Sequence, residues 1–162
     1  MQKITPNLWF NRNAEEAVNF YTSLFPHSKT GRKTHYGKEG FEFHQMPEGT
    51  VLTIEFYLED QKFVALNGGA IFKFTEAISF IVDCGSQEEV DKYWNALTAD
   101  GGEESQCGWL KDKFGVSWQI VPKRLMQLLE DKDTAKVSRV TNAMLKMRKI
   151  IISDLEAAAD HK

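Results

Sequence analysis

The chain has 162 residues, 42% of them hydrophobic, which is enough for one domain or for two half-size modules that share a core. Its net charge is −3 with acidic and basic residues interspersed, which excludes an electrostatic footprint for nucleic acid or an anionic membrane. No apolar run approaches the ~20 residues of a membrane-spanning helix, so we expect no membrane partner.

The first half of the chain predicts a strand, a helix and then several antiparallel strands. Residues 4–10 alternate, which places Asn7 and Trp9 on the strand face opposite Leu8 and Phe10. Asn13 is a suitable N-cap, and apolar residues then recur at helical spacing as far as residue 24. The further predicted strands are Lys29–Tyr36, Phe41–Met46, Val51–Leu58 and Gln61–Leu66.

The second half of the chain predicts the same order of elements. A strand at Ala77–Val82 leads to Ser86, a suitable N-cap for a helix that ends at two consecutive glycines, residues 101 and 102. Further strands are predicted at Glu103–Leu110 and Val116–Val121. Each half is therefore expected to be a βαβββ module.

An internal repeat supports this division. The segment Glu15–Leu24 is echoed by Glu88–Leu97 at a constant offset of 73 residues without gaps. One such module leaves a sheet face uncovered, so we expect two modules to pair into a curved mixed sheet with a cleft. The predicted class is α+β, with one compact domain divided into a first module at 1–72, a second module at 73–122 and a C-terminal helical extension at 123–162.

The extension predicts a short helix at Arg124–Leu129 and a longer one that begins at Asp133 or Thr134 and continues through Ile151. The longer helix carries an apolar stripe that must pack on something. Docking on its own domain and contact with a second copy of the chain are both open interpretations. We expect a homodimer.

Several stretches resemble the vicinal oxygen chelate superfamily, which includes glyoxalase I, extradiol dioxygenases and bleomycin-resistance proteins. Its first-helix signature is matched by residues 14–26, and its closing turn and last strand are matched by Asp112–Ile120. More specifically, Phe63–Gly69, Lys73–Phe80 and Gln106–Leu110 resemble the PhnB-like branch, which often carries the legacy label 3-demethylubiquinone-9 3-methyltransferase. The resemblance covers residues 3 to 152 or so.

The resemblance implies where a metal would bind, because enzymes of this superfamily hold a divalent ion with one side chain from the first and last strand of each module. The matching first-strand positions are Thr5 and Ala77, and the matching last-strand positions are about Ala65 and Gln119. Alanine has no ligand atom, and an uncharged Thr–Gln pair is a poor site for a divalent ion. The four histidines show no metal-site spacing; they are His27, His35, His44 and His161. We therefore expect no metal.

The legacy label implies S-adenosylmethionine as a cofactor, but the sequence does not support it. A typical enzyme of that class has a glycine-rich loop between a strand and a helix, followed by an acidic ribose ligand. The chain has no G-x-G-x-x-G pattern, and neither of its Gly-Gly pairs opens a helix after a strand. We expect no cofactor.

The polar and aromatic residues expected on the inward strand faces suit a ligand cavity. The proposed lining is Asn7, Trp9, Asn67, Ser79, Cys107, Trp109 and Gln119. Each has a plainer interpretation: core packing for the tryptophans, a left-handed turn at Asn67-Gly68-Gly69, and a half-buried thiol for Cys107. Cys107 is a weak candidate nucleophile, with Lys111 and Lys113 as its nearest cations in sequence. His44 and Glu55 are weaker acid–base candidates.

The leading functional hypothesis is a metal-free protein that binds a small apolar or aromatic molecule. The alternatives are a divalent-metal lyase, isomerase or dioxygenase of the same superfamily, and a pure dimerisation module. The cytoplasm is the expected compartment, because the chain has only two cysteines and no apolar stretch typical of a signal peptide.

Overall fold

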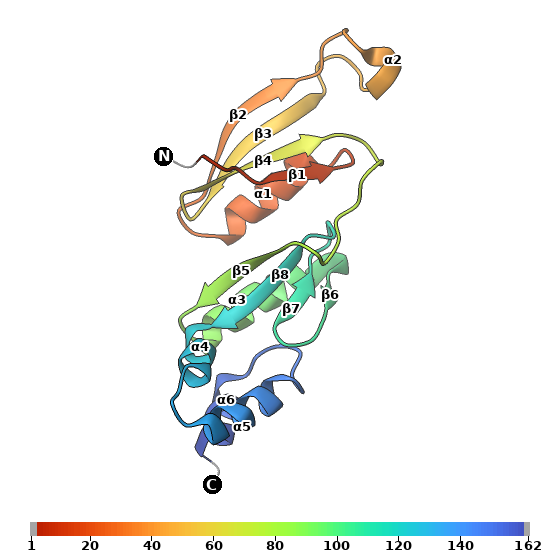
Figure 1. The fold of residues 1–162 in the computed structure, drawn as a ribbon. Coiled ribbons are helices and arrows are strands. Elements are labelled where there is room, and N and C mark those ends of the chain that lie inside the picture. Colours follow the sequence, from red (N-terminus) through yellow and green to blue (C-terminus); the bar gives the residue numbers. More distant parts are fainter. Residues whose placement is uncertain (1–2, 161–162) are drawn as a thin grey trace. The chain divides into compact units, whose positions relative to one another are not determined.

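The computed structural model describes residues 3–160, so His161 lies outside the described residues. The chain divides into two compact units, the first ending at Phe74 and the second beginning at Thr75. Each unit contains one four-stranded mixed sheet. The predicted α+β class is therefore confirmed, and each unit has the expected βαβββ order (Figure 1).

The first unit is a βαβββ module with a short helix inserted between its second and third strands. Its strands lie in the order β1-β4-β3-β2, with β1 parallel to β4 and the other neighbours antiparallel. The elements are β1 (Asn7–Phe10), α1 (Ala14–Leu24), β2 (Lys29–His35), α2 (Phe41–His44), β3 (Val51–Leu58) and β4 (Gln61–Asn67).

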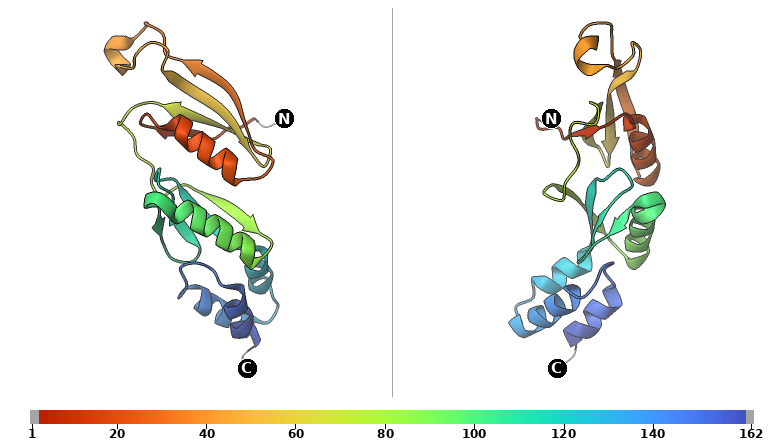
Figure 2. Two further views of the ribbon diagram at one scale, coloured as in Figure 1. Left: turned by 180° about the vertical axis from the view of Figure 1, so that it is seen from behind. Right: turned by 90° about the vertical axis from the view of Figure 1, so that its right-hand side faces the viewer.

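Helix α1 covers one face of this sheet, as the rear view in Figure 2 shows. Its buried stripe includes Ala17 and Tyr21, and the Tyr21 ring stacks on Phe56 of β3 at a centroid distance of 6.3 Å. In β1, Leu8 and Phe10 are buried, as the alternation predicted. The core of the unit therefore lies between α1 and the sheet.

The predicted strand at Phe41–Met46 is wrong, because α2 occupies residues 41–44. The helix lies between two residues in the left-handed region, Gly40 at φ 75° and Gln45 at φ 53°. A tight reversal at each end closes the segment into one helical turn, whose last bond joins the Gln45 amide to the Phe41 carbonyl at 2.8 Å.

The second unit repeats the module with sheet order β5-β8-β7-β6. Its elements are β5 (Ser79–Cys84), α3 (Gln87–Thr98), the 3₁₀ turn η1 (Ala99–Gly101), β6 (Glu103–Glu104), β7 (Trp109–Lys111) and β8 (Ser117–Pro122). The predicted N-cap is confirmed, since the Ser86 hydroxyl accepts a bond from the Glu89 amide at 3.4 Å. The repeated segments fall in α1 and α3, so the internal repeat marks the equivalent helices.

The single strand predicted at Glu103–Leu110 is two strands, β6 and β7, joined by a turn. Cys107 at φ 58° and Gly108 at φ 84° reverse the chain there. A Cβ atom on Gly108 would lie 2.8 Å from the Ile120 carbonyl oxygen, so only glycine fits this approach. The turn returns the chain to pair with β8.

Three helices follow the second module: α4 (Lys123–Leu129), α5 (Thr134–Met144) and α6 (Ile152–Asp160). The capping prediction is confirmed, because the Asp133 side chain accepts bonds from the first turn of α5. The prediction that this helix continues through Ile151 is wrong. The carbonyls of Met147 and Arg148 instead bond to the amides of the β6–β7 turn at 2.8 and 2.7 Å. These carbonyls therefore bond the turn in place of the amides four residues further on that a continuing helix would offer.

The extension packs on its own unit. Its apolar cluster is buried, with Leu125, Val140, Ile150 and Leu155 at its centre. Gln87 of α3 joins it to the module, because its side chain bonds the Ile150 carbonyl at 3.1 Å and the Ile152 amide at 2.8 Å. No helix within residues 3–160 is both long and apolar enough to span a membrane.

Candidate functional site

The face of the first sheet opposite α1 carries two of the predicted lining residues, Asn7 and Trp9. Asn7 is exposed and pairs with Val64, whereas Trp9 is half-buried and pairs with Leu66. The Trp9 indole N–H donates to the Gly69 carbonyl at 2.8 Å, and its ring meets Phe72 edge-on at 4.9 Å. These contacts hold the indole at the wall of a cavity.

That cavity, of about 790 Å³, lies entirely within the first unit, and we call it the aromatic cavity. Its wall combines rings from β1, the end of β2 and α2 with the loop after β4. The lining includes Trp9, Tyr36, Phe43, His44, Met46 and Leu66. Only Trp9 among the predicted lining residues faces it. His44 was considered from the sequence as an acid–base group, whereas Phe43 was missed because α2 was assigned to a strand.

His44 uses both ring nitrogens within the fold. Its Nδ1 accepts the Met46 amide at 2.9 Å, which leaves Nε2 to donate to the Glu39 carbonyl at 3.1 Å. The ring also packs against Tyr36 at a centroid distance of 4.5 Å. Both ring nitrogens of His44 are therefore engaged within the fold, which argues against the acid–base role considered from the sequence.

Asn67 is buried, with 2% of its surface exposed. Its Oδ1 accepts the Ala14 amide at 2.9 Å and its Nδ2 donates to the Val51 carbonyl at 3.0 Å. The side chain thus supplies the N-terminal cap of α1 that Asn13 was predicted to supply, since Asn13 makes no capping bond. Contact between the Asn67 side chain and a ligand stays a prediction.

Glu55, the other acid–base candidate, lies on β3 and is paired. Its Oε1 accepts from Lys62 Nζ at 3.0 Å and from Arg32 at 3.2 Å. The hydrogen bond from Lys62 is the main cause that lowers the pKa of Glu55. The carboxylate is therefore ionised at neutral pH and is a poor general base.

In the second unit, three predicted lining residues share the sheet face opposite α3. Gln119 of β8 pairs with Trp109 of β7, and its amide donates to the Ser79 hydroxyl at 2.9 Å. Trp118, by contrast, is buried, and its indole N–H donates to Asp112 at 2.9 Å. The structure therefore brings Ser79, Trp109 and Gln119 together and assigns Trp118 to the core.

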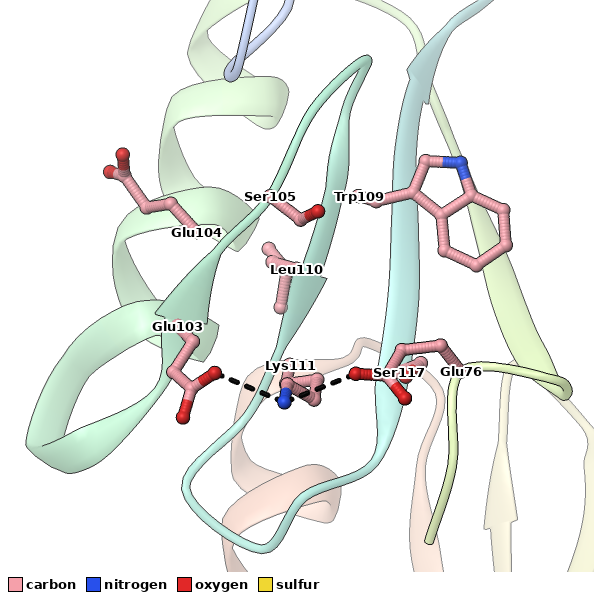
Figure 3. Close-up of a pocket in the computed structure, with 8 residues that line it drawn as sticks. All are labelled: Glu76, Glu103, Glu104, Ser105, Trp109, Leu110, Lys111 and Ser117. Carbon is pink, nitrogen blue, oxygen red and sulfur yellow. Dashed lines mark ion pairs between the residues drawn. The ribbon is translucent and has the colours of Figure 1, made fainter.

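A smaller pocket of about 160 Å³ lies beside them and is lined by Trp109, Lys111 and Ser117 among others. Figure 3 shows the Lys111 ammonium between two carboxylates, at 3.1 Å from Glu76 and 3.0 Å from Glu103. The hydrogen bond to Glu103, and after it the one to Glu76, raises the pKa of Lys111. The Ser117 hydroxyl is buried and has no hydrogen-bond partner within the described part of the chain.

The two cysteines differ in environment. Cys84 is fully buried, and burial, reinforced by the charges of Glu89 and Asp83, raises the pKa of its thiol to about 12. Cys107 is half-buried in the β6–β7 turn, where its amide donates to the Met147 carbonyl. Lys111, one cation proposed to activate Cys107, is held by its two glutamates. The nucleophilic role of Cys107 stays a prediction.

Comparison with known proteins agrees with this geometry. The family model for 3-demethylubiquinone-9 3-methyltransferase matches residues 2–121. The chain belongs to this family. It is thereby a PhnB-like member of the vicinal oxygen chelate superfamily, as the sequence motifs indicated. The match ends before α4, so the helical extension lies beyond the family's common module pair.

Solved structures support the assignment. A putative 3-demethylubiquinone-9 3-methyltransferase, PhnB protein, from Bacillus cereus is 38% identical and covers 75% of this chain and 99% of its own, with a TM-score of 0.66. A Pseudomonas aeruginosa protein is 20% identical over 75% and 98% of the two chains, with a TM-score of 0.54. The fosfomycin resistance protein FosX from Listeria monocytogenes is 14% identical over 80% and 98%, with a TM-score of 0.56. The last two show likeness of fold alone. A comparison with curated proteins found no match.

The donor set does not fit the divalent metal that the superfamily implies. Ala65 was the wrong last-strand position, because it is fully buried on the α1 side. In the first sheet, Trp9 of β1 pairs with Leu66 of β4. In the second sheet, Ile81 of β5 pairs with Gln119 of β8, so Leu66 is the counterpart of Gln119. Leucine, like alanine, has no ligand atom.

The first-strand positions do not improve the set. Thr5 and Ala77 both precede their strands, and neither supplies a histidine. Within residues 3–160, no three His, Cys, Asp or Glu side chains gather closely enough to hold a metal ion. No step is therefore assigned to a metal.

The residues do not fit the methyl donor that the family description implies either. The β1–α1 connection, residues 11–13, contains no glycine, and the β5–α3 connection contains only Gly85. A nucleoside cofactor of the usual doubly wound enzymes needs a glycine-rich turn at this place, so that its backbone can approach the cofactor. Neither connection offers such a turn to a methyl donor.

Proposed function

We propose that this protein is a metal-free small-molecule-binding protein of the glyoxalase and bleomycin-resistance type. Its ligand would be a small apolar or aromatic molecule held in the aromatic cavity of the first unit. The observation that carries the proposal is the size and chemistry of that cavity. Its volume of about 790 Å³ lies within the range of ~300–1,000 Å³ typical of small-molecule sites.

The rings that line the cavity support an apolar contact surface. The N–H of Trp9 bonds Gly69, and the hydroxyl of Tyr36 donates to the Asn67 carbonyl at 2.7 Å. Both nitrogens of His44 are also bonded within the fold. Since these polar atoms are satisfied, the rings offer mainly their faces and edges, which suits stacking on a flat ligand.

Gly68 gives a sharp test of the site. A Cβ atom at this position would lie 2.2 Å from Cζ2 of Trp9, so Gly68→Ala must displace the indole from the cavity wall. We expect weaker binding of 2-naphthamide, a neutral planar probe, measured by calorimetry. Gly85→Ala is the matched control, because its nearest contact is the movable Glu89 carboxylate at 3.4 Å.

Failure of wild-type protein to bind any planar aromatic compound in a thermal-shift screen would refute the proposal. Equal affinity in Gly68→Ala and wild type would show that binding occurs elsewhere. The metal-enzyme alternative is tested separately by elemental analysis. Near-stoichiometric zinc, nickel, iron or manganese in purified protein would overturn the metal-free assignment.

The second unit carries further residues of the proposed lining. Ser79, Trp109 and Gln119 share a sheet face, which supports their role in ligand contact at this unit. Alanine substitution of Trp109, which lines the smaller pocket, would leave binding unchanged if they have no such role.

We also propose a homodimer in the cytoplasm. Two large apolar side chains at β5, Ile78 and Ile81, are 75% and 61% exposed, and a second copy of the chain would cover them. Light scattering tests the assembly, and a mass of 18.5 kDa, that of one chain, would contradict it. The free thiols of Cys84 and Cys107 suit a reducing compartment.

A further inference from the structure

The lining of the aromatic cavity includes one positively charged side chain besides its aromatic rings. Arg12, in the connection between β1 and α1, lies on its lining. No aspartate or glutamate occurs among the described lining residues. The chain as a whole carries a net charge of −3, so a cavity lined by one cation and no acid departs from the average surface.

The Arg12 guanidinium is not used by the fold. No hydrogen bond, ion pair or ring contact of Arg12 occurs with any residue in the range 3–160. The nearest acid along the described chain, Glu15, is paired instead with Lys33 at 3.0 Å. Arg12 is therefore a cation at the cavity with no internal counter-charge among these residues.

Two uncharged amide side chains also lie at the cavity. Asn11 and Gln45 line it, and their side-chain amides have no partner in the described part of the chain. The polar atoms of Trp9 and His44 are already bonded. Arginine donates hydrogen bonds and accepts none, so the group that Arg12 recognises must be an acceptor.

We propose that the ligand of the aromatic cavity is a planar aromatic carboxylate. Its ring packs against Trp9 and Phe43, and its carboxylate accepts hydrogen bonds from the Arg12 guanidinium. The inference rests on the proposed function, because it names the class of molecule that the same cavity takes. A guanidinium presents parallel N–H donors in a planar fork, which matches the two oxygens of a carboxylate.

The matched pair of probes is 2-naphthoate and 2-naphthamide, which share their ring and shape but differ in charge. We expect calorimetry of the full chain to show about tenfold or tighter binding of the carboxylate. Arg12→Gln keeps a polar hydrogen-bonding side chain, although a shorter one, and removes the charge. We expect it to bind the two probes equally, with the affinity for 2-naphthamide unchanged.

Arg32→Gln is the control variant. Arg32 is an exposed arginine of the same unit, but it pairs with Glu55 and does not line the cavity. It should retain the full preference for 2-naphthoate, and that preference should weaken as salt rises in both wild type and Arg32→Gln.

The outcomes separate the two proposals. Equal binding of both probes to the wild type, or a preference that survives in Arg12→Gln, overturns the carboxylate inference while the proposed binding function stands. If neither probe binds the wild type, and the wider screen of planar compounds is also negative, the proposed function falls and the inference falls with it.

Discussion

Removal of the Asn67 amide is the sharpest test of how the first unit is held together. Asn67→Ala deletes the acceptor of the Ala14 amide and the donor to the Val51 carbonyl. Ala14 is fully buried and Val51 is 8% exposed, so water does not readily replace either bond. A buried polar group left without a partner costs about 1–3 kcal/mol, so the two together predict a loss of about 2–6 kcal/mol.

The assay is urea-induced unfolding followed by far-ultraviolet circular dichroism at neutral pH. Asn19→Ala is the control, because Asn19 is an exposed residue of the same helix, where alanine favours helix formation. We expect it to change the free energy of unfolding by less than about 0.5 kcal/mol. A loss below about 1 kcal/mol in Asn67→Ala would refute the capping role deduced from the two bonds.

Two further predictions concern the second unit. Asp112 accepts the amides of residues 114 and 116 through Oδ1 and the Trp118 indole through Oδ2. Asp112→Asn keeps the Oδ1 acceptor but places an amide N–H donor against the Trp118 indole N–H. The free energy of unfolding should therefore fall by about 1–3 kcal/mol, and an unchanged value would contradict this network. Burial raises the pKa of Cys84 to about 12, so the folded state favours the neutral thiol. The contribution of this thiol to the stability of the fold is complete below the unfolded-state pKa of about 8.5. It is lost as the pH rises toward the folded-state pKa. The stability of wild type relative to Cys84→Ala should therefore fall from pH 9 to pH 11, and a constant difference would contradict the shift.

The secondary structure that the sequence predicted correctly is local in origin. The alternation of Leu8 and Phe10 with Trp9 places one face of β1 in the core, and the actual burial follows it. The caps at Ser86 and Asp133 bond their own helices, within three residues in sequence. Such patterns depend on a few neighbouring residues, so they are readable without knowledge of the rest of the chain.

The errors occur where distant segments compete with local preference. α2 replaces a predicted strand where the left-handed residues Gly40 and Gln45 close the chain into one helical turn. α5 ends at Met144 because the segment after it bonds the β6–β7 turn. Asn67 shows the same effect for a side chain. The sequence indicates a turn residue or a ligand contact, but the partners of its amide lie 53 and 16 residues away.

The sequence by itself determined the repeated βαβββ modules and the family, because these depend on periodicity and motif. It also placed Trp9 on the face that meets the cavity. Only the tertiary structure decided that rings from the end of β2 and from α2 line the cavity, with Arg12 beside them. The reason is physical: a cavity exists between elements, so its wall is set by strand register and loop closure and not by any one local pattern.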